Sequence, residues 1–104
     1  MISLPKVETK DGVALDGLRI QMWPVLEIAA QIWRAAGQQL VVTSTTGGRH
    51  GKGSRHYDGL AVDLRTRYFS DEERVRVLDQ LRAALGDEYD VVLERTHMHV
   101  EYDP

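Results

Sequence analysis

The sequence contains no cysteine, and this absence excludes two kinds of chemistry at once. No disulfide framework can stabilise the chain, and no thiolate can bind a metal ion. Any transition metal must therefore be held by histidine and carboxylate side chains. The chain has 4 histidines, so these are the first residues to follow.

A long apolar run is also missing. Pro5 and the charges that follow it stand where a secretory signal needs roughly 7–15 continuous apolar residues. The most apolar region, residues 22–36, is interrupted by Pro24, Glu27 and Arg34, and it falls short of the roughly 20 residues that span a bilayer. We therefore expect no signal peptide, no membrane partner and a soluble protein made in the cytoplasm.

No surplus of positive charge is present, because 13 Lys and Arg stand against 16 Asp and Glu, for a net charge of -3. The glycine-rich loop of residues 47–54 is locally basic, with Arg49, Lys52 and the adjacent Arg55, yet it has no aromatic platform for nucleic-acid bases. Within it, Gly51-Lys52 is followed by Gly53, whereas a phosphate-binding P-loop needs Ser or Thr at that position. We expect no nucleic-acid partner.

The length and composition predict one small domain over residues 1–104, since 104 residues with 42% hydrophobic content can bury one continuous core. Residues 1–17 read as an extended lead. Pro24 suits a first helical turn and Gly37 a helix stop, while Ser70 and Glu73 have the spacing of a capping box.

Apolar periodicity then predicts the helices and strands. The second helix should carry Val75, Leu78, Leu81 and Leu85 on its apolar face. The expected helices span residues 24–36 and 70–85, and the expected strands span residues 40–45, 60–65, 91–93 and 97–102.

Ionisable residues gather in two of these strands and the loop before them. In the strand of residues 60–65, Asp63 points away from the apolar face, and His97, His99 and Glu101 share one face of the last strand. His56 precedes Asp63 by seven positions, with a glycine between them that permits a turn.

Histidine nitrogen and carboxylate oxygen both suit zinc, which takes three protein ligands in catalytic sites and leaves a fourth position for water. His56, Asp63 and His99 supply such a set. We expect a Zn²⁺ site, although ligands of this kind tolerate several divalent ions.

The same residues resemble a known family. Residues 54–63, SRHYDGLAVD, are similar to the S-x-H-x-x-G-x-A-x-D pattern of zinc D-Ala-D-Ala carboxypeptidases and L-alanyl-D-glutamate endopeptidases, and His97-Met98-His99 resembles the H-x-H of the wider group that includes lysostaphin-type enzymes. The resemblance covers roughly residues 24–102. It implies an α+β fold, with two helices packed on a small antiparallel sheet and a single zinc on the open face of that sheet.

The resemblance also implies a function, namely hydrolysis of peptide bonds in bacterial peptidoglycan peptides by a zinc metallopeptidase. His56, Asp63 and His99 would be the metal ligands, and Arg49 would contact a substrate carboxylate or carbonyl. A small domain of this type fits a phage or prophage protein that reaches the cell wall with the help of another factor.

One position departs from the family pattern. In the D-Ala-D-Ala branch a Glu or Asp three residues before the last histidine acts as general base, but this chain has Thr96 there. His97, on the same strand face as His99, is our first candidate for the catalytic acid or base, and Glu94 is the second. Thr96 also keeps an alternative open, in which the chain is a zinc-binding phage structural or interaction module without activity.

Overall fold

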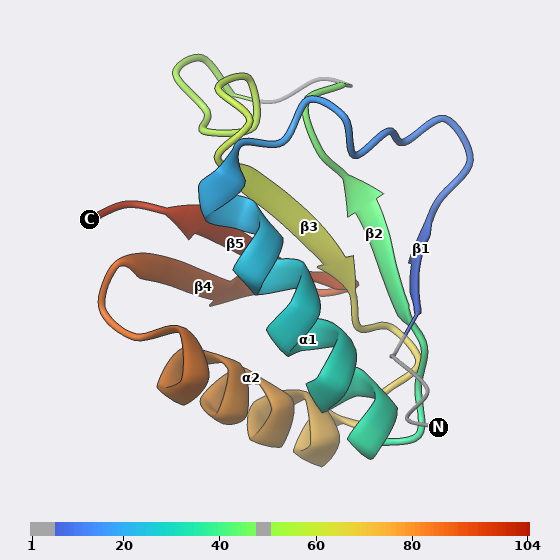
Figure 1. Ribbon diagram of the computed structural model, residues 1–104. Helices are drawn as coiled ribbons and strands as arrows, with labels where there is room; N and C mark the ends of the chain where they lie inside the picture. Colours follow the sequence, from blue (N-terminus) through green and yellow to red (C-terminus); the bar gives the residue numbers. More distant parts are fainter. Residues whose placement is uncertain (1–5, 48–50) are drawn as a thin grey trace, which may run out of the picture.

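Five strands form one open sheet in the computed structural model, which describes residues 6–47 and 51–104 (Figure 1). The order of the strands across the sheet is β1-β2-β3-β5-β4. Along the chain the elements are β1 (Val7–Thr9), the 3-10 helix η1 (Ile20–Met22), α1 (Trp23–Ala35), β2 (Leu40–Ser44), β3 (Ala61–Arg65), α2 (Asp71–Leu85), β4 (Tyr89–Leu93) and β5 (His97–Tyr102). The predicted α+β class is confirmed.

The sheet is mixed, so the prediction of an antiparallel sheet was wrong at one edge. β2, β3, β5 and β4 pair antiparallel, but β1 pairs parallel with β2. The cause is the connection: the chain leaves β1, crosses over through η1 and α1, and returns to the sheet in its original direction. β1 lies inside the segment that the sequence indicated only as an extended lead.

The two helices begin and end close to their predicted positions. Proline occupies the first turn of α1, and Ser70 caps α2 through the predicted capping box, with its side chain accepting from the backbone N–H of Glu73. α2 buries Val77, Leu78 and Leu81, whereas Val75 is 53% exposed. Val75 was placed wrongly because Val77 and Leu81, four residues apart, set the centre of the buried face and leave Val75 on its flank.

Both helices lie against the same face of the sheet (Figure 1). Their apolar residues meet Val62, Leu64, Met98 and Val100, all fully buried side chains of β3 and β5. Side chains alternate along a strand. The residues between them, among them Asp63, His97, His99 and Glu101, therefore belong to the face that the helices leave uncovered.

Candidate metal centre

The predicted ligands come from one loop and two neighbouring strands. Asp63 and His99 are direct partners in the antiparallel pairing of β3 with β5, so the register places their side chains next to each other. His56 lies in the turn before β3 and is only 2% exposed. Two strands and a loop thus bring together residues that are 43 positions apart in the sequence.

The three ligand atoms form a small triangle. Asp63 Oδ1 lies 3.2 Å from His56 Nε2 and 3.0 Å from His99 Nδ1, and the two nitrogens are 3.2 Å apart. With metal–ligand bonds of about 2.0–2.1 Å, tetrahedral zinc requires its ligand atoms to be roughly 3.3 Å apart. The observed separations match this requirement, so His56, Asp63 and His99 could hold a metal ion.

Hydrogen bonds on the far sides of both rings fix which nitrogen faces the triangle. The Nδ1–H of His56 donates to the backbone carbonyl of Thr45 at 2.7 Å, and the Nε2–H of His99 donates to Glu101 at 2.8 Å. Because a carbonyl and a carboxylate only accept, His56 Nε2 and His99 Nδ1, both beside Asp63, are the nitrogens that the neutral rings leave free for a metal ion. Partners of this kind are typical of histidines that bind metals.

The electrostatics of the group agree with this geometry. Burial disfavours ionisation of Asp63, but hydrogen bonds with His56 and His99 outweigh it and lower the pKa of its carboxyl well below the ordinary range. The hydrogen bond with Asp63, supported by that with Glu101, raises the pKa of His99 from 6.5 to about 9 despite its burial. Without a metal, a proton therefore occupies the place between His99 and Asp63.

The loop that carries His56 is held against the N-terminal lead. Gly59 has φ +74°, and an added Cβ would clash with the carbonyl oxygen of Gly17. The Gly59 carbonyl accepts from the backbone N–H of Arg19 at 2.9 Å. The glycine of the S-x-H-x-x-G pattern is therefore required where two backbone segments approach closely.

Two further residues near His56 have clear roles. Ser54 Oγ accepts from the backbone N–H of His56 at 3.2 Å, so it supports the turn. Thr45, 3% exposed, donates its hydroxyl to the Ala14 carbonyl at 2.6 Å while its own carbonyl accepts from His56. Sequence reasoning missed Thr45, since a backbone carbonyl leaves no residue-type signal.

The two candidates for proton transfer lie in contact with each other. His97 Nε2 is 3.1 Å from Glu94 Oε2 and 3.8 Å from Asp63 Oδ2, and Thr96 Oγ1 is 3.3 Å from His97 Nδ1. A tight turn between β4 and β5, closed by the Glu94 N–H donating to the His97 carbonyl at 2.9 Å, brings Glu94 to His97. Arg49, the predicted substrate contact, lies outside the described residues.

A second group of potential ligands, Asp90, Glu101 and Asp103, lies beside the first. It offers only carboxylates, and Asp90 and Asp103 are exposed. A hydrogen bond with Asp103 raises the pKa of Asp90 above its ordinary value. We assign no ion to this group.

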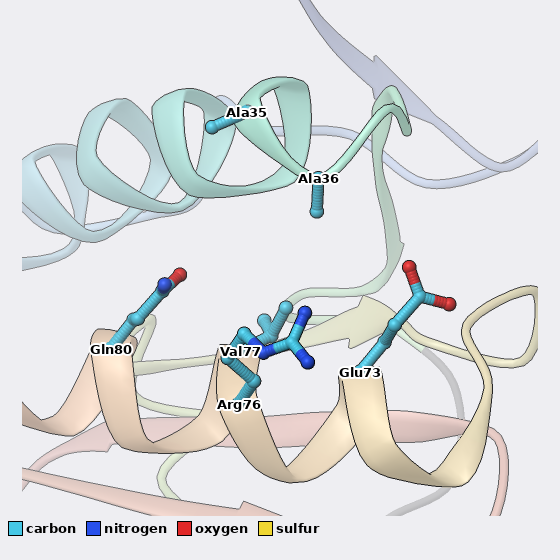
Figure 2. Close-up of a pocket in the computed structure, with 6 residues that line it drawn as sticks. All are labelled: Ala35, Ala36, Glu73, Arg76, Val77 and Gln80. Atoms are coloured by element: carbon cyan, nitrogen blue, oxygen red, sulfur yellow. The ribbon is translucent and has the colours of Figure 1, made fainter.

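A hollow between the helices is separate from the metal centre. Figure 2 shows Arg76 of α2 reaching between Glu73 and Gln80 toward the end of α1 at Ala36. Because the hollow belongs to the helix layer, it lies on the opposite side of the sheet from Asp63 and His99.

Comparisons with protein families and with curated proteins find no match for this chain. Within residues 6–47 and 51–104, no helix combines the length and the apolar character needed to cross a membrane. The site must therefore be interpreted from its own chemistry.

Proposed function

We propose that the protein is a zinc-dependent metallopeptidase that hydrolyses peptide bonds in bacterial peptidoglycan peptides. One observation carries the proposal: two histidine nitrogens and one carboxylate oxygen, each 3.0–3.2 Å from the others, converge on the uncovered face of the sheet. Three ligands of this type are the set used by catalytic zinc, because they leave one coordination position open. The peptidoglycan substrate rests on the resemblance of residues 54–63 and 97–99 to the zinc carboxypeptidases and endopeptidases of the cell wall.

His56, Asp63 and His99 would hold the zinc. When bound, zinc lowers the pKa of a coordinated water toward ~7 and polarises a substrate carbonyl. The protein holds these ligands in place beforehand through Thr45 and Glu101, so little rearrangement accompanies binding.

His97 and Glu94 would move the protons. The Nε2–H of His97 donates to Glu94, and the same nitrogen lies on the Asp63 side of the ring, 3.8 Å from the carboxylate. Glu94 is 52% exposed, so it can exchange protons with solvent. Glu94 would take up the proton released by the attacking water and pass it to His97, and His97 would then give it to the departing amine.

Mass spectrometry of peptidoglycan digests tests this proposal and also reports which bond is cut. The zinc-loaded protein should release peptide products, and His97→Ala should retain zinc while losing cleavage. Arg95→Ala, an exposed change in the same turn, is the matched control and should cleave normally. Absence of product from every peptidoglycan fragment would contradict the peptidase.

Thr96 favours a second candidate, a zinc-binding phage structural or interaction module without activity. Its exposed side chain contacts His97 but cannot act as a general base. Thr96→Asp separates the two functions. If the parent protein is inactive and the variant cleaves peptide, the native site lacks its base. If the parent is active and the variant cleaves no faster, proton transfer by His97 and Glu94 is favoured.

A further inference from the structure

Arg65 lies beside the metal centre and has no anionic partner among the residues that the structure describes. It follows Asp63 by two positions on β3, so both side chains belong to the uncovered face, and it is the direct partner of His97 in the pairing of β3 with β5. Arg65 is partly buried, and its guanidinium lies 5.9 Å from the centre of the Tyr68 ring.

Three other arginines of the described residues have polar partners. Arg55 pairs with Asp103 at 3.3 Å, Arg74 donates to the Thr66 carbonyl at 3.2 Å, and Arg82 donates to the Val91 carbonyl at 2.7 Å. Within residues 6–47 and 51–104, Arg65 has the ring contact with Tyr68 and no ion pair. A partly desolvated guanidinium of this kind is ready to bind a carboxylate in the bidentate manner that arginine favours.

Charge is distributed unevenly over the uncovered face around the metal centre. Glu94, Glu101 and Asp90 lie on β5 and β4 or at their junction, and all three carboxylates repel an anionic group from that side. Arg65 lies on β3, on the other side of His97. A bound peptide would therefore place an anionic group over β3.

We infer that Arg65 selects peptides that carry a free carboxylate close to the bond that is cut. Two residues along a strand span about 6.7 Å, so the carboxylate would lie one or two residues from the metal centre. This inference rests on the proposed function, and it adds the class of substrate that the site prefers. It concerns a residue distinct from Arg49.

The test compares a synthetic peptidoglycan stem peptide with forms in which its carboxylates are replaced one at a time by amides. Cleavage of the acid by the zinc-loaded protein should exceed cleavage of one amidated form by roughly 10- to 100-fold in kcat/KM, the range of a charge-assisted hydrogen bond. Arg65→Gln should lose this preference while retaining the zinc content of the parent. Arg65→Lys should recover part of it.

Arg67→Gln is the matched control, since it removes the same charge from an exposed arginine whose guanidinium also lies over Tyr68, at 4.9 Å. It should preserve the preference for the acid. Equal cleavage of acid and amides by the parent, or an undiminished preference in Arg65→Gln, would overturn the inference and leave the peptidase standing.

Binding of the same peptides, measured by calorimetry, separates the inference from the proposed function. If the zinc-loaded protein cleaves nothing but binds the acid more tightly than an amide, and Arg65→Gln abolishes the difference, then the carboxylate site is supported and the peptidase is contradicted. Equal binding of acid and amides would overturn the carboxylate site.

Discussion

The two faces of β3 and β5 carry different kinds of side chain, although the residues that form them alternate along the same two strands. One face presents Val62, Leu64, Met98 and Val100 to the helices, each with no exposed surface. The other presents Asp63, Arg65, His97, His99 and Glu101, all partly exposed. The covered face therefore supplies the stability of the fold, while the uncovered face is free to place charged groups at distances set by the strand register.

Truncation of the covered face should have the largest effect on stability. Leu64→Ala removes buried methyl groups from beneath the helices and should lower the free energy of unfolding by about 2–5 kcal/mol. Denaturant unfolding of the metal-free protein measures this loss. Val92→Ala on the uncovered face, where Val92 is 47% exposed and is the register partner of His99, is the control and should change stability by less than about 0.5 kcal/mol. Similar losses in both variants would contradict the division between the faces.

A smaller effect is expected from the residue that orients His99. Glu101→Gln replaces a carboxylate acceptor with an amide and weakens the hold on the ring nitrogen opposite the metal. Zinc affinity should fall by roughly 10- to 100-fold, measured by competition with a chelator. The fold should be retained, as judged by far-UV circular dichroism. Unchanged affinity would show that the bond from Glu101 has no part in metal binding.

An effect of similar size is the pH dependence of zinc binding. Since the pKa of His99 is raised to about 9, the metal-free protein holds a proton at this ring at pH 7, and zinc must displace it. Affinity should therefore rise by about tenfold per pH unit from pH 7 toward pH 9 and then level off. The same shift stabilises the metal-free fold below pH about 6.5, and this contribution is lost as the pH rises through about 9. Chelator competition at pH 7, 8 and 9 measures this dependence, and a constant zinc affinity would contradict the prediction.

Much of this division can be predicted from the sequence. Period-two alternation in β5 places His97, His99 and Glu101 on one face, and the structure agrees. Capping by Ser70 and the proline in the first turn of α1 also locate both helices. These features are local, so a single stretch of sequence contains the whole signal.

The features that sequence reasoning missed depend on contacts between distant segments. The parallel pairing of Val7 with Leu40 follows from the path of the chain, not from the short β1 segment itself. The bond from His56 to the Thr45 carbonyl joins residues 11 positions apart through a backbone group that every residue has. The contact between Glu94 and His97 likewise depends on the geometry of the turn, which brings the two candidates for proton transfer next to each other.

The metal centre itself is tested by the zinc content of the purified protein, compared with that of single-residue variants after dialysis against a weak chelator. We expect one zinc per chain, lost in His56→Ala, Asp63→Ala and His99→Ala but retained in His97→Ala, with folded protein in every case. Two results would contradict a metal centre formed by these three residues. In one, zinc stays bound when His99 is removed; in the other, the parent protein binds no zinc and is no more stable with zinc than without it.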